Sequence, residues 1–339
     1  MIRAYVLTKQ NKPLKLMELE VPKLKYGQVL VKVLFAGICG TQIDEIFGKK
    51  GKDIYIPHLI GHEGSGEVID IGPGVKKCSK GDLVVLHWRT SKGVESEFPY
   101  YYKVNNRKKR IGAGLITTFS DKTIISENRL TVIDKRTPPA IACLLGCSLT
   151  TAMGIINNNS RIKIGDSALV SGAGSLGQSI IFALNQVCCN EIYAIDVDKK
   201  KTNFVKKIGA THTFNNYESL VKKDFDTIID TTGVPKVIST NYKFLKDFGS
   251  LIITALPKKD KSIPLFLEQR NQGKKIIDSS GGDTNPDTDI PKYINLILNK
   301  KIKPKKLIDK IIKPTQLNEY IFKIKKGKTR GKILVKFNA

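Results

Sequence analysis

Short apolar runs separated by Gly, Pro and Asp dominate the first third of the chain. The run at 29–36 is rich in Val and Leu, and similar runs occupy 66–72 and 81–86. Short strands with turns about every eight to twelve residues are typical of compact β domains. We therefore predict that residues 1 to about 36 and the runs that follow form a β-rich domain, in which the polar, aromatic stretch 88–122 is a loop.

A helix is predicted where this strand pattern ends. Two more short strands are expected at 123–125 and 130–133, and Pro138 and Pro139 then precede an apolar stretch at 140–153. Proline is favoured at the first position of a helix. We predict one continuous helix over this apolar stretch.

From about residue 165 the pattern changes to alternating strands and helices. This alternation is typical of a parallel, doubly wound sheet with helices on both faces. The predicted strands are 167–171, 191–196, 225–230 and 250–255, and the predicted helices are 175–187, 199–208 and 235–245.

The last fifty residues contain a predicted helix at 290–299 and a predicted strand at 333–337. That strand has no place in the alternating half, so we expect it to return to the first domain. The predicted fold class is α/β, with a β-rich domain plus a doubly wound parallel-sheet domain. The predicted boundaries are 1–150 with 290–339 for the first domain, and 151–289 for the second.

Length and composition are those of a globular protein of two domains. The 339 residues exceed the size of a usual single core, and 41% of them are hydrophobic. No stretch of about 18 uncharged apolar residues appears, so we expect no membrane partner. The first ten residues lack the apolar region of a secretory signal, and the six cysteines are spaced unlike a disulfide scaffold. A reducing, cytoplasmic location is therefore predicted.

The formal net charge of +26 invites a nucleic-acid interpretation, which the distribution of the charge weakens. The excess is nearly all Lys and is spread from end to end, whereas Arg, the residue that forks onto phosphates and guanine edges, is scarce. The densest cluster, 107–110, is interpreted as a solvated loop. We expect no nucleic-acid partner, although a basic surface favours the approach of phosphorylated or otherwise anionic substrates.

A glycine-rich turn at 172–177 is the first candidate site. A predicted strand leads into it and a predicted helix leads out, which is the context of a dinucleotide-binding turn. Gly172 would make the turn, Gly174 would let the backbone approach phosphate, and Gly177 would let helix pack on strand. The free N–H groups at the helix start, at Ser175 and Leu176, would hold the pyrophosphate. The alternative is a tight turn that binds nothing.

Asp196 supports the dinucleotide interpretation, because it ends the next predicted strand nineteen residues after Gly177. There it would accept hydrogen bonds from the adenosine ribose, and its charge would repel a 2′-phosphate. NAD is therefore favoured over NADP. The neighbouring lysines 199–201, of which Lys201 is predicted to contact the cofactor, soften this preference.

Cys39, His62 and Cys147 are the second candidate site. Singly, a buried Cys is usually a small hydrophobic residue and a lone His is usually structural. Together, they form the Cys₂His set of a catalytic zinc site with an open fourth position. Each also lies beside glycine, which allows a loop to bend tightly around an ion.

The order of these motifs resembles the zinc-dependent alcohol dehydrogenases of the medium-chain dehydrogenase/reductase superfamily. The matching segments are 37–41, 61–66, 81–84, 145–147 and the glycine turn, and they extend over essentially the whole chain. The resemblance implies a GroES-like catalytic domain divided by a Rossmann domain. It also implies that Cys39, His62 and Cys147 bind one catalytic zinc.

The same resemblance implies further roles. Glu63 matches a residue next to the metal ligands that contacts the ion indirectly or transiently, and Thr41 matches a hydroxyl that bridges substrate and cofactor ribose. Trp88 matches an aromatic wall of the substrate pocket, and Thr151 matches a nicotinamide contact.

Three departures from the family pattern stand out. No cysteine occurs at 88–122, where many relatives bind a structural zinc, so one zinc per chain is predicted. Gln42 stands where an Asp commonly orients the ligand histidine, so an amide instead of a carboxylate would contact that ligand. Asp44 stands where some relatives place a proton-relay histidine, so a catalytic role is assigned to it only by position.

The predicted function is interconversion of an alcohol and an aldehyde or ketone by hydride transfer with NAD(H). A zinc-independent reductase on the same scaffold and a non-catalytic NAD-binding protein are the alternatives. The substrate is left open among polyols, sugar derivatives, aldehyde adducts and simple alcohols. The resemblance suggests a homodimer or homotetramer.

Overall fold

The computed structural model describes residues 1–339 except 50, 223, 256, 258–260, 265–272 and 338–339, and for 106–108 it describes the backbone alone. The chain forms two units, Met1–Cys147 with Asn285–Ala339 and Ser148–Thr284. The first unit is thus made from both ends of the chain, and the second is inserted between them. The boundaries predicted from the sequence are 150/151 and 289/290.

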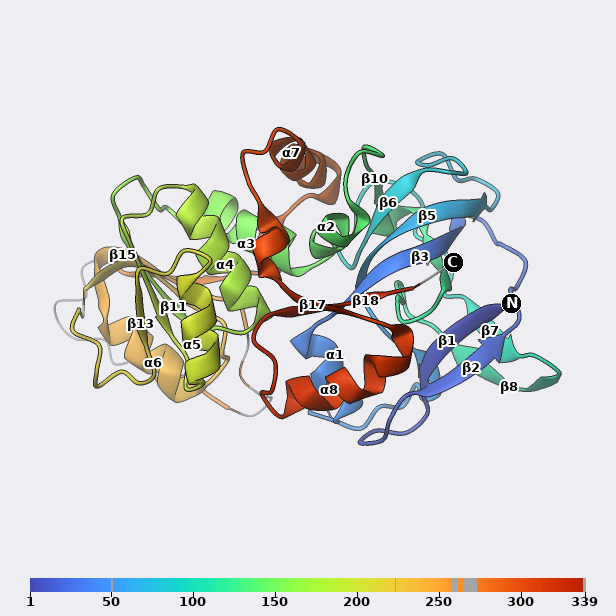
Figure 1. Ribbon diagram of the computed structural model, residues 1–339, viewed down its shortest axis with the longest axis horizontal. Helices are drawn as coiled ribbons and strands as arrows, with labels where there is room; N and C mark the ends of the chain where they lie inside the picture. The colour runs from blue at the N-terminus through green and yellow to red at the C-terminus, as the bar shows by residue number, and fades with distance from the viewer. Residues whose placement is uncertain (50, 223, 256, 258–260, 265–272, 338–339) are drawn as a thin grey trace. The chain divides into compact units, whose positions relative to one another are not determined.

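The first unit is built from β strands with a few short helices (Figure 1). Strands β1, β2, β7, β8 and β4 close into a barrel, and a seven-stranded sheet has the order β10-β6-β5-β3-β18-β17, with β9 also paired to β3. The strands of this unit are β1 Ile2–Leu7, β2 Lys15–Leu19, β3 Gln28–Ile38, β4 His58–Leu59, β5 Glu63–Ile71, β6 Leu83–His87, β7 Tyr100–Lys103, β8 Asn106–Gly112, β9 Lys122–Ser126, β10 Leu130–Val132, β17 Ile308–Ile312 and β18 Lys332–Lys336. Its helices are α1 Gly40–Ile46, α2 Pro139–Leu144, α7 Pro286–Leu298 and α8 Leu317–Lys325, with 3₁₀ turns η1 Glu127–Arg129, η4 Pro304–Leu307 and η5 Pro314–Gln316.

Strand β3 organises this unit, because it pairs with β5, β9 and β18. Its side chains Val29, Val31 and Val33 lie fully buried in the main hydrophobic cluster. The last strand, which the sequence analysis expected to return to the first domain, is β18, and Ile333 pairs with Ile38 in antiparallel register. The two ends of the chain therefore share one sheet.

The expectation of a loop over 88–122 was wrong in part, because β7 and β8 form a hairpin of the barrel. Tyr101 is fully buried, and its hydroxyl accepts the Ile124 N–H at 3.1 Å. Ile111, its partner across the hairpin, is also buried. Exposed Tyr, Lys and Arg residues alternate with these two side chains, which hid the strands in the sequence.

The single helix predicted at 140–153 is also wrong, because the chain forms α2, a turn at 145–147, and α3. The turn packs against two other strands: a Cβ at Gly146 would lie 2.4 Å from the Leu86 carbonyl oxygen and 3.0 Å from Glu63. A residue without a side chain is therefore needed there. Because the helix is broken, Cys143 and Cys147 do not share one regular helical face.

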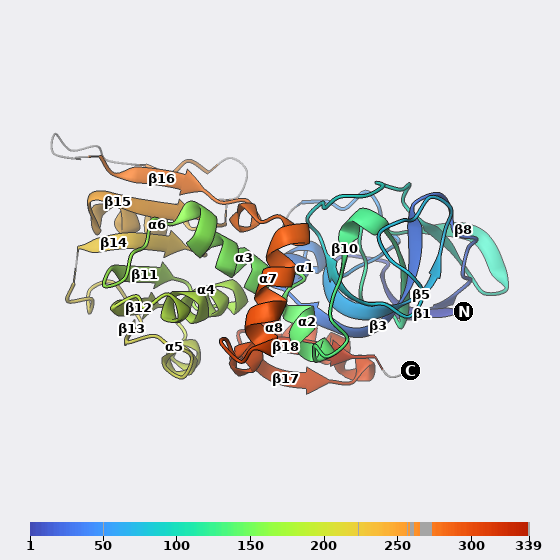
Figure 2. The same cartoon turned by 90° about the horizontal axis from the view of Figure 1, so that it is seen from above.

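The second unit contains a six-stranded parallel sheet in the order β13-β12-β11-β14-β15-β16 (Figure 2). Strands β11 and β14 are buried along almost their whole length, as expected of a sheet covered on both faces. Helix α4 contacts β11 and β12, and α6 contacts β14 and β15. Its elements are α3 Ser148–Gly154, the π-helical turn η2 Ile155–Asn159, β11 Ser167–Ser171, α4 Ser175–Gln186, β12 Glu191–Ile195, α5 Lys199–Lys206, β13 His212–Phe214, β14 Phe225–Asp230, α6 Pro235–Lys243, β15 Leu245–Ile253, β16 Lys275–Asp278 and the 3₁₀ turn η3 Gly281–Asp283.

The fold agrees with the predicted class, an α/β chain with a β-rich part and a doubly wound parallel sheet. Within the described residues, no helix has both the length and the apolar character needed to cross a bilayer.

Candidate functional site

Three elements of the β-rich unit bring the predicted metal ligands together. Cys39 lies between β3 and α1, His62 lies directly before β5, and Cys147 follows the helix break at Gly146. One ligand atom from each of the three side chains lies within 4.8 Å of the other two. A tetrahedral zinc with bonds of about 2.0 to 2.3 Å has ligand atoms about 3.5 Å apart, which lies within the limit that these three atoms satisfy.

Gln42 orients this cluster from the first turn of α1. Its side chain is almost fully buried, its Oε1 accepts the Cys39 N–H at 3.0 Å, and its Nε2 contacts Nδ1 of His62. Nε2 of His62 is therefore the ring nitrogen left for a metal. A side chain that fixes the ring orientation of a ligand histidine commonly supports metal sites.

The two cysteines of the cluster differ in electrostatics. The pKa of Cys39 lies well below its usual value because the Cys147 thiol donates to its sulfur and because His62 and Lys332 add positive potential. The pKa of Cys147 is raised, since it is the donor in that pair and is buried near Glu63. Thiolate is the form that binds a metal, so Cys39 is already disposed to act as a ligand.

Next to the cluster, Glu63 and Lys332 form a buried ion pair. The sequence predicted a role for Glu63 but none for Lys332. Burial raises the pKa of Glu63, while Lys332 opposes this shift. Burial lowers the pKa of Lys332, but the surrounding Glu63, Cys39 and Cys147 outweigh this and raise it above its usual value. One oxygen of Glu63, Oε2, bonds no described group, which leaves it as a buried acceptor beside the ligand histidine.

Thr41 and Asp44 lie on α1 with different surroundings. Thr41 Oγ1 lies 3.9 Å from Cys39 Sγ, so this exposed hydroxyl lies next to the first ligand. Asp44 instead pairs with Lys49 at 2.8 Å on a partly exposed surface. The structure thus places Thr41, but not Asp44, beside a described member of the metal cluster.

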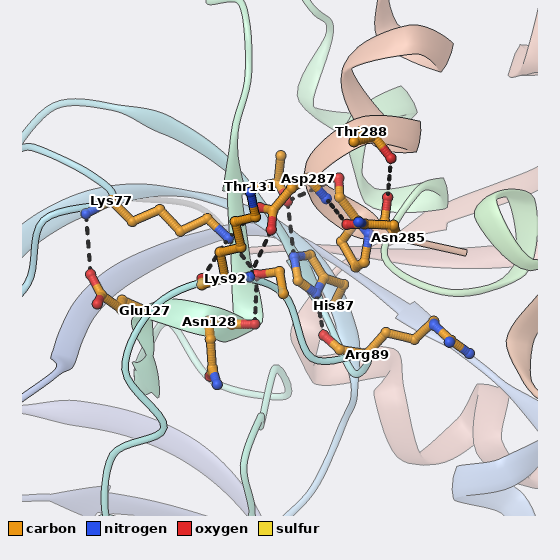
Figure 3. A network of polar contacts seen from close by, with 12 residues as sticks. Lys77, His87, Arg89, Lys92, Glu127, Asn128, Thr131, Asn285, Asp287 and Thr288 are labelled. Carbon is orange, nitrogen blue, oxygen red and sulfur yellow. Dashed lines mark hydrogen bonds and ion pairs between the residues drawn. The ribbon is translucent and has the colours of Figure 1, made fainter. Parts of the chain in front are cut away.

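Trp88 is partly buried against the main hydrophobic cluster, and the Arg89 guanidinium lies 5.4 Å from its ring centroid. The preceding residue, His87, is fully enclosed in a polar network (Figure 3). Its Nδ1 contacts the Arg89 carbonyl at 2.8 Å and its Nε2 contacts Thr131 Oγ1 at 3.0 Å. Burial lowers the pKa of His87 to about 4, so this histidine is neutral and structural.

The same network fixes the beginning of α7, where the chain re-enters the β-rich unit (Figure 3). Asp287 pairs with Lys77 Nζ at 2.7 Å and accepts the Lys92 N–H at 2.7 Å. These contacts link segments that lie almost two hundred residues apart in the chain.

A cavity of about 1030 Å³ lies wholly within the β-rich unit. His62 and Gln42 form part of its wall, and Trp88 does not. The other lining residues are Gln10, Glu45, residues 51–61, Phe98, Tyr100, and residues 109, 110 and 112–117 near the end of the β7–β8 hairpin. Typical ligand cavities measure about 300 to 1,000 Å³, so this one lies at the upper end.

In the parallel-sheet unit, the three glycines of the turn lie in different environments. Gly172 has a φ of +94°, and a Cβ at Gly177 would lie 1.9 Å from the Gly172 carbonyl oxygen, so both positions require glycine. A Cβ at Gly174 would meet nothing within 4 Å, so open space lies in front of this residue. Helix α4 begins at Ser175 and Leu176, and the buried Ser175 Oγ bonds no described group. A cradle with open space and an unused hydroxyl at a helix start fits a phosphate group.

Asp196 closes this turn from the end of β12. Its Oδ2 accepts the Ala173 N–H at 2.8 Å and its Oδ1 accepts the Asp198 N–H at 2.9 Å. Lys201 Nζ lies 3.7 Å from the same carboxylate. Thr151 is buried in α3 of this unit. The structure therefore ties Asp196 and Lys201 to the glycine turn and places Thr151 on a separate helix.

Comparison with known proteins gave concordant results. A family model described as the alcohol dehydrogenase GroES-like domain matches residues 25–135, and one described as zinc-binding dehydrogenase matches residues 175–299. S-(hydroxymethyl)glutathione dehydrogenases from Escherichia coli and Shigella sonnei are 31% identical over 253 residues, which is 67% of this chain and 67% of theirs.

Solved structures of the same fold extend over the whole chain. An alcohol dehydrogenase zinc-binding domain protein from Burkholderia ambifaria aligns with a TM-score of 0.90 at 22% identity, covering 100% of this chain and 99% of that one. Benzyl alcohol dehydrogenase from Acinetobacter calcoaceticus aligns with a TM-score of 0.87 at 22% identity, covering 99% of both chains.

Proposed function

Because this chain belongs to the zinc-dependent alcohol dehydrogenase family of the medium-chain dehydrogenase/reductase superfamily, we propose that it interconverts an alcohol and an aldehyde or ketone with NAD(H) and one catalytic zinc per chain. The observation that carries this proposal is the cluster of Cys39, His62 and Cys147, with ligand atoms within 4.8 Å of one another. This is the ligand set of a catalytic site with an open position.

The three ligands would hold the ion, and its chemistry when bound is that of a Lewis acid that polarises the substrate oxygen. Gln42 keeps the His62 ring in position through its contact with Nδ1. Glu63 and Lys332 supply a fixed, buried charge pair behind the ligands. Thr41 Oγ1 accepts the hydroxyl proton of the substrate alcohol and passes it outward, where Asp44 or solvent takes it up.

The glycine turn would hold the cofactor, which supplies hydride exchange at its nicotinamide ring when bound. The N–H groups of Ser175 and Leu176 bind the pyrophosphate, and the space in front of Gly174 admits it. Asp196 accepts from the adenosine ribose and makes NAD the favoured cofactor, with Lys201 next to it. Thr151 contacts the nicotinamide. The family role of Trp88, as an aromatic wall of the substrate pocket, stays a prediction, because Trp88 does not line the cavity beside His62.

The test is a spectrophotometric NADH screen against alcohols and aldehydes, with zinc measured on the same sample. The panel includes S-(hydroxymethyl)glutathione, which is named in the relatives at 31% identity. Turnover together with about one zinc per chain supports the proposal, and two tightly held zincs would contradict the single-site assignment. Turnover that persists without metal would favour a zinc-independent reductase, and NADH binding without zinc or turnover would favour a non-catalytic protein.

The proposal extends to assembly and location. We propose a homodimer or homotetramer, in line with the family resemblance, which size-exclusion chromatography with light scattering tests directly. A cytoplasmic location is supported by the cysteines, since all six are free thiols.

A further inference from the structure

The cavity of the β-rich unit is lined by one predicted metal ligand, His62, and by a group of basic side chains. His62 and Gln42 contribute to one part of its wall, while Lys52, Lys109 and Arg110 contribute to another. All of these residues belong to the same unit. A molecule in this cavity therefore has access to the ligand histidine and to the three cations at once.

The three cations are exposed, and two of them are uncompensated. Lys52 and Lys109 form no ion pair with any residue that the structure describes. Arg110 lies with its guanidinium carbon 4.2 Å from the Tyr100 ring centroid. Stacking on an aromatic ring fixes the plane of a guanidinium and leaves its N–H donors free to bind a carboxylate or phosphate.

The acidic groups of the same cavity are already engaged by a histidine. Asp53 Oδ2 lies 2.7 Å from His58 Nε2, and Glu45 lies 3.9 Å from the same nitrogen. Asp53 also accepts the Tyr55 N–H at 2.9 Å, and its side chain is only 11% exposed. The Asp53 carboxylate therefore lies low in the wall beside a histidine, the Glu45 side chain is 32% exposed, and all three cations are exposed.

The size and the apolar lining of the cavity exceed what a simple primary alcohol requires. Its volume is about 1030 Å³, and Ile54, Tyr55 and Phe98 add large apolar surfaces that are about half or more exposed. Exposed apolar side chains beside unpaired cations suit a ligand with a carbon chain and an anionic end.

We propose that the substrate of this enzyme is an alcohol or aldehyde that carries a phosphate or carboxylate at the end remote from the reacting carbon, and that Lys52, Lys109 and Arg110 bind this anionic group. The inference rests on the proposed dehydrogenase function and names its substrate class. Phosphate and carboxylate share the oxyanion chemistry that the three cations recognise.

The high net charge of the chain is a competing cause of any preference for anions, so the test needs a matched control. Lys103 lies on the same hairpin as Lys109, is exposed, and does not line the cavity. Lys103→Ala removes one positive charge from the same hairpin without touching the cavity wall. If the net charge of the chain attracts anions, Lys103→Ala and Lys109→Ala should lower the preference for anionic substrates equally. If the cavity binds the anionic group, only Lys109→Ala should lower it.

The experiment compares aldehydes of increasing chain length, each with a terminal phosphate, carboxylate or methyl group, as substrates of the zinc-loaded enzyme. We expect wild type to prefer the anionic members by about tenfold or more in kcat/KM, mainly through KM. Lys109→Ala and Arg110→Ala should remove most of this preference, and Lys109→Glu should reverse it, while Lys103→Ala behaves as wild type. Comparison of kcat/KM between the phosphate series and the carboxylate series shows which of the two anions the cavity prefers.

A binding measurement makes the outcome independent of turnover. Butyl phosphate and butanol are titrated calorimetrically into the zinc-loaded chain and into Lys109→Glu. Tighter binding of butyl phosphate that Lys109→Glu abolishes supports the inference. Equal binding of the two probes, or turnover of neutral aldehydes with no anionic preference, overturns it while the dehydrogenase function stands. Absence of turnover with every aldehyde overturns the proposed function instead.

Discussion

Lys332 and Glu63 form a buried ion pair across 269 residues of sequence, with side chains that are 2% and 0% exposed. Lys332 begins the last strand of the chain, and Glu63 directly follows the ligand His62. The pair therefore couples the return of the C-terminal strand to the residue beside the metal ligand.

Replacing this lysine tests the coupling. Lys332→Met leaves Glu63 as an unpaired buried carboxylate, and we expect the free energy of unfolding to fall by about 3 to 5 kcal/mol. Urea denaturation followed by circular dichroism measures this change. Lys336→Met, at an exposed position of the same strand, should change stability by less than about 0.5 kcal/mol. Equal effects of the two variants would show that the pair does not act as a buried unit.

The third metal ligand gives a second prediction. Cys147→Ala should lower the zinc content from about one per chain to near zero and abolish turnover, because two ligands rarely retain a catalytic zinc. NADH affinity should stay within about twofold of wild type, since the glycine turn is untouched. Cys188→Ser is the control, because this exposed cysteine lies in the other unit. A near-normal turnover rate of metal-free Cys147→Ala would contradict the zinc assignment.

The glycine turn allows stability and cofactor binding to be separated. Gly177→Ala places a methyl 1.9 Å from the Gly172 carbonyl oxygen, so we expect a loss of about 1 to 3 kcal/mol or more in unfolding free energy. Gly174→Ala meets no neighbour and has a φ of −72°, so stability should be unchanged. Its methyl would occupy the space in front of the turn and weaken NADH binding about tenfold. Thermal melts and NADH fluorescence titrations measure the two effects, and unaltered NADH affinity in Gly174→Ala would count against pyrophosphate binding there.

Asp196 is expected to set the cofactor preference. Asp196→Ala removes the acceptor of the ribose and the bond to Ala173 N–H, so NADH binding should weaken by about tenfold or more. The discrimination against NADPH should relax at the same time, because the negative charge beside Lys201 is lost. Kinetic constants with both cofactors measure the ratio. An unchanged ratio would contradict the ribose assignment.

His87 predicts a pH dependence of stability. Its pKa is lowered to about 4 in the folded chain from a usual 6.5, so the unfolded chain binds its proton first as the pH falls. The stabilisation by neutral His87 is complete above about pH 6.5 and is lost as the pH falls toward 4, by about 3 kcal/mol in total. His87→Gln lacks this loss, so the stability difference between wild type and variant should shrink with acidification. A difference independent of pH would contradict the assignment.

The parallel sheet was the part of the fold that sequence patterns determined well. Strands 167–171 and 225–230 have the predicted bounds, because a strand buried on both faces is an apolar run with polar or glycine neighbours. The positions of Cys39, His62 and Cys147 were found by residue type and by resemblance, and the structure brings their ligand atoms together.

The parts that were missed depend on tertiary contacts. The break at Gly146 follows from its approach to the Leu86 carbonyl, which helix propensity does not contain. The role of Lys332 was hidden because one buried lysine looks like the many exposed ones in this lysine-rich chain. Tyr101 stands between Tyr100 and Tyr102 in a polar, aromatic stretch that was predicted to be a loop, although its side chain lies in the barrel core.

The antiparallel pairing of β18 with β3 has a consequence for the order of events during synthesis. Cys39, His62 and Cys147 leave the ribosome before the whole inserted unit, while Lys332 follows Glu63 by 269 residues. At about 5 to 20 residues per second, a nascent chain carries Glu63 without its counter-ion for about 15 to 50 seconds. Until β18 is translated, the sheet that carries Cys39 at the end of β3 therefore lacks one of its strands.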